Sequence, residues 1–342
     1  MTTQPERSRR KRGFRWWIRY ILIGSVLLIL VFGVFTWLEG KSAKANLMKQ
    51  YPAPGQLVDV GGYKMHIFCT GQGSPTVIMD AGNNDFSVVW ARVQPEVARF
   101  TRVCAYDRAG FGWSEPGLQP RTSETMVKEL HTLLVNARVE KPYVLVGHSF
   151  GGMNMRLYFH DYPDEVAGMV LVDSAHEEQT VRVPALKKAV GQQDGQFRTL
   201  AYMNSFGLLA LSPENIPNRG YPNEALAQYR AILATTGYFK TAIAETEALD
   251  QSFAEVRAAQ ITSLGNLTLI VLSRGLPYPL PGMSQSENQQ YEQAWKVMQS
   301  ELAALSSNSK QIIATQSGHY IQLQQPQLVI DAIHEIVQAT QK

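Results

Sequence analysis

With 342 residues, of which 45% are apolar and 18% charged, the chain is too apolar for an intrinsically disordered protein and long enough for one large or two modest globular domains. Its net charge of +3 comes from the N-terminus, because the first twenty residues hold seven Lys or Arg and one Glu and so carry +6, whereas the remainder carries −3. A slightly acidic body gives no sign of a nucleic-acid-binding surface on the folded part. Two cysteines are too few for a disulfide-rich scaffold or a four-cysteine zinc site.

The N-terminal segment combines a basic tail, residues 1–19, with a run that has no charged side chain, residues 20–38. As a helix, nineteen residues extend about 28 Å, close to the roughly 30 Å of a hydrocarbon core. Trp and Tyr side chains stand at both ends of the run, where amphipathic rings favour the headgroup region. We therefore predict one transmembrane helix over 20–38. The basic flank before it predicts a cytoplasmic N-terminus and an extracytoplasmic body.

A cleaved signal peptide is the alternative for this segment. Ala43-Lys44-Ala45 places small residues at the spacing of a cleavage site. The apolar region of a signal peptide usually covers only about 7 to 15 residues, so the length of the run favours an uncleaved anchor.

After a linker, residues 39–55, the body over 56–342 alternates short apolar runs with helix-length segments. The runs lack in-and-out alternation, which is typical of strands buried on both faces. The predicted strands are Lys64–Cys69, Thr76–Met79, Val103–Tyr106, Tyr143–Val146, Met169–Val172, Leu267–Leu272 and Lys310–Ala314, and the predicted helices are Ser123–Asn136, Gly152–His160 and Gln327–Gln338. This order predicts a mainly parallel sheet covered by helices, interrupted by a helical insertion over 177–262.

One strand runs directly into a motif that carries chemistry. Residues 143–146 are followed by Gly147-His148-Ser149-Phe150-Gly151 and then by a predicted helix, which is the G-x-S-x-G pattern in its strand-turn-helix context. The tight turn lifts the serine above the sheet edge, and the two glycines let strand and helix approach each other. The helix also directs its first N–H groups toward developing negative charge. We therefore predict Ser149 as a nucleophile, in preference to a purely structural Gly-rich turn.

From about Val58 to its end the sequence resembles the α/β-hydrolase superfamily. Asp80-Ala81-Gly82-Asn83-Asn84 is similar to the oxyanion loop, although Ala81 replaces a histidine often found there. Tyr106–Ser114 resembles the loop after the next strand, and Ser317-Gly318-His319 resembles the loop of the catalytic histidine. The resemblance implies an α/β fold with a mostly parallel eight-stranded sheet, an antiparallel first hairpin, and a helical cap inserted after the sixth strand.

A serine hydroxyl needs a base to take its proton, and the family places that base where His319 stands. The triad acid has more than one candidate, because the family usually supplies it after the seventh strand, where no acidic residue occurs before Glu287. Asp173 ends the sixth strand, a position that haloalkane-dehalogenase-like members use. We favour Asp173, with Glu287 or Glu292 as alternatives.

The remaining residues near the motif receive supporting roles. Backbone N–H groups of Asn83 and Phe150 are the predicted oxyanion donors. His148, Asp107 and Arg108 are expected to organise their loops rather than to contact substrate.

Serine at position 149 predicts acyl chemistry, most simply hydrolysis of a carboxylic ester, thioester or amide through an acyl-enzyme; aspartate there would have indicated an epoxide hydrolase or dehalogenase. The alternatives are an acyltransferase and an inactive receptor or scaffold of the same fold. We expect a small, apolar acyl substrate, attachment to a membrane, no nucleic-acid partner, no metal and no other cofactor. Aromatic residues of the insertion are candidates for the pocket wall or for packing between its helices: Phe197, Tyr202, Met203, Phe206, Tyr238 and Phe239.

The family topology also makes the strands of Cys69 and Cys104 neighbours. An exported compartment permits their oxidation, so a cross-strand disulfide and two buried thiols are both open.

Overall fold

The computed structural model describes residues 7–235 and 237–341; residues 1–6 of the predicted basic tail lie outside the described residues. Its centre is an eight-stranded sheet in the order β1-β2-β4-β3-β5-β6-β7-β8. The strands are β1 (Gln56–Asp59), β2 (Lys64–Thr70), β3 (Thr76–Asp80), β4 (Val103–Tyr106), β5 (Tyr143–His148), β6 (Val166–Val172), β7 (Thr268–Arg274) and β8 (Ser309–Ala314). β2 pairs antiparallel with β1 and β4, and every other pair is parallel. The predicted α/β fold class is confirmed.

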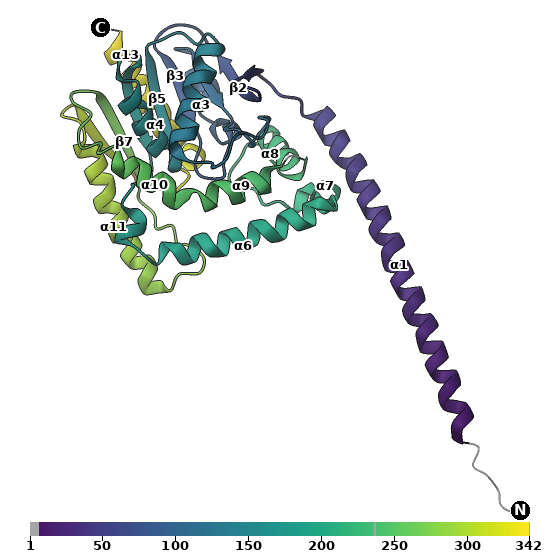
Figure 1. The fold of residues 1–342 in the computed structure, drawn as a ribbon. Coiled ribbons are helices and arrows are strands. Elements are labelled where there is room, and N and C mark those ends of the chain that lie inside the picture. Colours follow the sequence, from purple (N-terminus) through teal and green to yellow (C-terminus); the bar gives the residue numbers. More distant parts are fainter. Residues whose placement is uncertain (1–6, 236, 342) are drawn as a thin grey trace, which may run out of the picture.

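Helices cover both faces of this sheet (Figure 1). Successive side chains of a buried strand point to opposite faces. Val144 and Val146 of β5 therefore join the core under α13, whereas Leu145 joins the core under α3 and α4. The covering helices are α2 (Gln94–Val97), α3 (Ser123–Asn136), α4 (Phe150–Asp161), α11 (Gln285–Ala304), α12 (Ile321–Gln324) and α13 (Pro326–Thr340), with 3₁₀ turns η1 (Ser87–Trp90) and η2 (Pro163–Glu165).

The chain between β6 and β7 is helical in its described part, where the sequence predicts the insertion. It contains α5 (Gln179–Arg182), α6 (Leu186–Ser205), α7 (Leu208–Leu211), η3 (Pro213–Asn215), α8 (Asn223–Thr235), α9 (Tyr238–Glu247) and α10 (Leu249–Ala258). In Figure 1 these helices lie together at one end of the sheet, with α6 and α9 crossing below it. We call them the insertion.

The long helix α1 (Arg7–Gln50) extends away from the body toward the N-terminus (Figure 1). Over Trp16–Gln50 it is long and apolar enough to cross a membrane, and its apolar window is not buried inside the structure. The helix does not end with the apolar run, because Glu39–Gln50 consists largely of good helix formers such as Ala, Leu, Lys and Met. The predicted linker over 39–55 is therefore helical up to Gln50.

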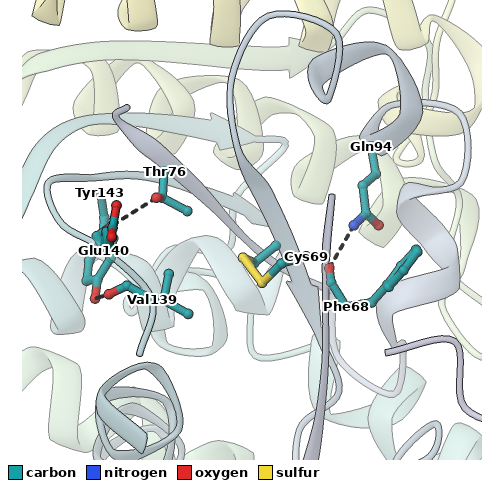
Figure 2. Close-up of a disulfide and its surroundings, with 8 residues drawn as sticks. Phe68, Cys69, Thr76, Gln94, Val139, Glu140 and Tyr143 are labelled. Carbon is teal, nitrogen blue, oxygen red and sulfur yellow. Dashed lines mark hydrogen bonds between the residues drawn. A yellow bond between two sulfur atoms is a disulfide. The ribbon is translucent and has the colours of Figure 1, made fainter. Parts of the chain in front are cut away.

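A disulfide links two neighbouring strands on the antiparallel side of the sheet. Cys69 of β2 and Cys104 of β4 are directly opposed in the strand register and are bonded to each other (Figure 2). Beside the bridge, Gln94 Nε2 donates a hydrogen bond to the carbonyl oxygen of Phe68 at 2.8 Å. Of the two states left open by the sequence, the structure contains the bridge.

Candidate active site

Ser149 occupies the sharp turn between β5 and α4, in a backbone conformation that L-residues seldom adopt, with φ 52° and ψ −120°. The two flanking glycines are required because other backbone atoms lie where a side chain would begin. A Cβ on Gly147 would lie 2.4 Å from the Cα of Gly152, and a Cβ on Gly151 would lie 2.5 Å from the carbonyl oxygen of Ala81. The G-x-S-x-G spacing therefore reflects two places where only backbone fits.

Three residues that are far apart in the sequence meet at this turn. His319 Nε2 lies 3.0 Å from Ser149 Oγ, and His319 Nδ1 lies 2.6 Å from Asp173 Oδ2. The histidine follows β8 and the aspartate follows β6. With Nδ1–H donating to the carboxylate, Nε2 has a free lone pair that faces the serine hydroxyl. This is the geometry that a base needs to take the serine proton.

Asp173 is completely buried, and several hydrogen-bond donors stabilise its negative charge. Oδ1 accepts hydrogen bonds from the Arg274 backbone N–H at 3.0 Å and from Trp295 Nε1 at 2.8 Å, and Oδ2 accepts one from Arg274 Nη1 at 2.9 Å. Burial alone raises the pKa of Asp173, but the Arg274 charge and the His319 hydrogen bond outweigh it and hold the pKa below its ordinary value. The carboxylate therefore stays ionised beside His319.

The two glutamates considered as alternative acids have other partners. Glu292 accepts from Arg274 Nη2 at 3.0 Å and from the Tyr278 backbone N–H at 2.9 Å. Glu287 forms a capping box with Ser284 at the start of α11. None of these contacts involves His319. Arg274, at the end of β7 near where the family usually supplies the acid, donates hydrogen bonds to Asp173, a role that the sequence did not reveal.

The loop after β3 passes directly beside Ser149. A Cβ on Gly82 would lie 3.3 Å from the Cβ of Ser149. The Gly82 carbonyl accepts a hydrogen bond from Arg108 Nη2 at 2.6 Å. In a trans peptide the C=O and the following N–H point in opposite directions, so the N–H of Asn83 points away from Arg108. Phe150 is the first residue of α4, and its N–H has no acceptor within the helix.

Arg108 is buried and fixed by further partners. Its Nη1 donates to Asp80 Oδ1 and to the Ala81 carbonyl, both at 2.8 Å, and its Nε donates to Glu245 Oε2 of the insertion at 3.0 Å. Arg108 thus ties the loop after β3 to α9. Asp107 likewise accepts from backbone N–H groups of Ser87 and Trp113 at 2.8 and 3.0 Å.

His148 contacts the loop that carries His319. Its Nε2 lies 2.9 Å from the backbone carbonyl oxygen of His319, so Nε2 carries the proton and donates it. Burial lowers the pKa of His148 to about 3, which keeps the ring neutral. His148 therefore connects the serine turn with the His319 loop.

A cavity of about 540 Å³ opens beside Ser149 and His319. The insertion supplies part of its wall through Leu186 and Val190 of α6 and Phe253 of α10. Polar side chains such as Gln192, Gln193, Lys187, Asp250 and Arg219 also line it, so the wall is mixed in character.

Of the two roles left open for the six aromatic and Met residues of the insertion, the pocket wall is not observed, because none of the six is among the described residues that line this cavity. Phe197, Tyr238 and Phe239 pack against one another, and Tyr202 and Phe206 are exposed. The reason is that α6 lines the cavity between Leu186 and Gln196, whereas these residues lie in the rest of α6, at its C-cap and in α9.

Comparison with known proteins agrees with this architecture. A family described as "alpha/beta hydrolase fold" matches residues 75–210. Among curated relatives, the uncharacterized protein YqjL of Bacillus subtilis is 27% identical over 266 residues, 78% of this chain and 85% of that one. The probable transporter efuK of Hormonema carpetanum is 31% identical over 136 residues, 37% of this chain but only 20% of that one.

Solved structures are similar over most of the chain. An esterase from Thermogutta terrifontis has a TM-score of 0.57 at 19% identity, covering 84% of this chain and 99% of that one. A putative acyltransferase from Salmonella enterica has a TM-score of 0.63 at 19% identity, covering 85% and 97%. At this level of identity the likeness shows the fold alone.

Proposed function

We propose that this chain, which belongs to the α/β-hydrolase superfamily by its fold and its family match, is a membrane-anchored serine hydrolase that cleaves carboxylic esters through an acyl-enzyme. The observation that carries the proposal is the continuous hydrogen-bonded chain from Ser149 Oγ through His319 to Asp173, at 3.0 and 2.6 Å. Each member has the partner that its role requires: a nucleophile with a base, and a base with an acceptor that fixes its tautomer.

In the first half of the proposed reaction, Ser149 Oγ attacks the ester carbonyl while His319 Nε2 takes the hydroxyl proton. The negative charge that develops on the carbonyl oxygen is stabilised by the backbone N–H groups of Phe150 and Asn83. Collapse of the tetrahedral intermediate breaks the bond to the alcohol, which leaves with the proton from His319. Asp173 remains ionised and stabilises the imidazolium.

In the second half, water replaces the alcohol. His319 takes a proton from the water as it attacks the acyl-serine carbonyl, and returns the proton to Ser149 Oγ as the acid is released. An acyltransferase would use the same steps with another acceptor in place of water. The mixed cavity wall supports an acyl group of modest size with some polar character.

Attachment to a membrane is proposed through α1, with the N-terminus cytoplasmic and the body on the other side. The uncharged run and the basic residues before it support this orientation. The Cys69–Cys104 disulfide supports the same side, because disulfides persist in oxidising, exported compartments. External protease added to spheroplasts should digest the body; a body that survives would reverse the orientation.

A fluorophosphonate probe tests the proposed activity directly. Wild-type protein should be labelled covalently, and Ser149→Ala should not. A chain-length panel of p-nitrophenyl esters, together with amide and thioester substrates, would then define the preferred bond. An unlabelled wild-type protein with an intact fold would show a catalytically inactive scaffold instead.

A further inference from the structure

Five large apolar side chains are exposed together on one short segment of the insertion. They belong to the end of α6, to the turn after it and to α7, and we call them the apolar patch: Tyr202, Met203, Phe206, Leu208 and Leu211, with exposures of 37–69%. Eight other large apolar side chains are exposed among the described residues 39–341, and they are separated along the sequence. Single exposed apolar residues are ordinary, whereas a cluster usually marks an interaction surface.

The α7 segment that carries part of the apolar patch lies beside α1 (Figure 1). Gly40 of α1 packs against Gly207, in the middle of the patch: a Cβ on Gly40 would lie 2.6 Å from the Cα of Gly207. Four residues further on, Lys44 Nζ donates to the backbone carbonyl of Asn204 at 2.5 Å. The uncharged run ends at Leu38, and two helical residues advance about 3 Å. The patch therefore meets α1 about 3 Å beyond the proposed hydrocarbon edge.

That level corresponds to the lipid headgroups. A bilayer of about 40 to 45 Å with a core of about 30 Å leaves roughly 5 to 8 Å of headgroup region on each side. Trp37 is 42% exposed, and Lys41 Nζ lies 4.7 Å from the centre of its ring. Trp and Lys are residues that anchor a helix at this level.

The segment that carries the patch has the composition expected for contact with lipid. No residue from Thr199 to Pro213 is charged. Two of the exposed rings, Tyr202 and Phe206, lie edge to face at 5.2 Å, so they present one continuous apolar and aromatic surface. An uncharged, aromatic-containing surface at the end of a spanning helix matches the surface of an interfacial helix.

We propose that the apolar patch inserts into the headgroup and outer acyl region of the bilayer that α1 spans, so that the insertion rests on the membrane surface. The inference depends on the proposed anchoring by α1. The bilayer is favoured over a second copy of the chain because the patch is continuous with the spanning helix and lies at the level of the headgroups.

Site-specific fluorescence in vesicles tests the proposal with the full chain. The two cysteines of the sequence are joined in a disulfide, so a single introduced cysteine is the one thiol available for a nitrobenzoxadiazole probe. The variants Tyr202→Cys and Leu208→Cys report on the patch in phosphatidylcholine vesicles that contain spin-labelled lipids. Leu28→Cys, 72% exposed near the centre of the uncharged run, reports on anchoring. Val135→Cys, 52% exposed in the last turn of α3, is the solvent control. The chain enters β5 soon after α3 ends, whereas Ser149 follows the far end of β5.

A lipid spin label near the headgroup should quench the Tyr202 and Leu208 probes severalfold more than the Val135 probe, and a deep label should quench the Leu28 probe. Quenching at Leu28, with Tyr202 and Leu208 no more quenched than Val135, would overturn the inference and leave the anchoring intact. An unquenched Leu28 probe would overturn the anchoring, and the inference with it.

Discussion

Replacing Asp173 by Asn should abolish most of the activity for a reason that the hydrogen-bond pattern makes specific. Oδ1 faces two donors that cannot change, the Arg274 backbone N–H and Trp295 Nε1, whereas Oδ2 faces one such donor, Arg274 Nη1, and His319, whose proton can move to its other nitrogen. An asparagine therefore places its carbonyl oxygen at the Oδ1 position, where an NH₂ group would meet two fixed donors. Its NH₂ group then takes the place of Oδ2 and faces His319 Nδ1, which is also a donor. The imidazole must move its proton to Nε2, and Nε2 then has no lone pair to accept the Ser149 proton.

The expected loss in kcat is about 10⁴, equivalent to about 5.5 kcal/mol of transition-state stabilisation. Initial rates on a p-nitrophenyl ester measure it, and circular dichroism with thermal unfolding shows whether the variant is folded. Glu292→Gln is the matched control, because a glutamine oxygen still accepts from Arg274 and from the Tyr278 backbone, and it should stay within about tenfold of wild type. A folded Asp173→Asn protein within tenfold of wild type, or equal losses in both variants, would refute the assignment.

Three further predictions concern stability. Burial lowers the pKa of His148 to about 3 from the 6.5 of the unfolded chain, so below about pH 6.5 unfolding takes up a proton. The free energy of unfolding in urea should therefore fall as the pH is lowered from about 6.5, by up to about 1.4 kcal/mol per pH unit. His148→Gln should flatten this dependence on pH. Gly40→Leu should destabilise the protein in detergent by about 1 to 3 kcal/mol, because its Cβ would meet backbone at 2.6 Å, whereas Gly33→Leu has nothing within 4 Å and should melt like wild type. Replacing Cys69 and Cys104 by Ala releases a link across 35 residues and should cost about 4 kcal/mol in urea unfolding; a loss below about 1 kcal/mol would contradict the loop-entropy argument.

Features encoded by adjacent residues were predictable from the sequence. Strand Val103–Tyr106 and helix Ser123–Asn136 have the predicted bounds, because apolar runs and helix signals are local. Strand β1 (Gln56–Asp59) was missed because it is short and mostly exposed, so no apolar run marks it. Its pairing with β2, rather than its own composition, makes it a strand.

The candidate site also has parts that adjacent residues encode and parts that depend on the packing of distant segments. The serine turn is encoded by five consecutive residues, whereas the meeting of Ser149 with His319 depends on packing between segments 170 residues apart, and it was predicted through family resemblance. The role of Arg274 was not predictable from its own position, because a buried guanidinium needs carboxylate partners, and here Asp173 and Glu292 come from other segments of the chain. Such a partnership follows from the fold and leaves no local pattern.

The insertion shows a different limit of sequence reasoning. Apolar residues at helical spacing were interpreted as pocket wall or as packing between helices, and both interpretations assume that apolar side chains turn inward. The assumption holds for Phe197, which packs against Tyr238 and Phe239, and fails for Tyr202, which is 69% exposed. A helix suited to span a membrane contacts the same segment, because Lys44 of α1 donates a hydrogen bond to the carbonyl of Asn204, two residues after Tyr202. Once the solvent changes from water to lipid, an outward-facing apolar side chain becomes the stable arrangement, because the bilayer removes it from water as a protein core would.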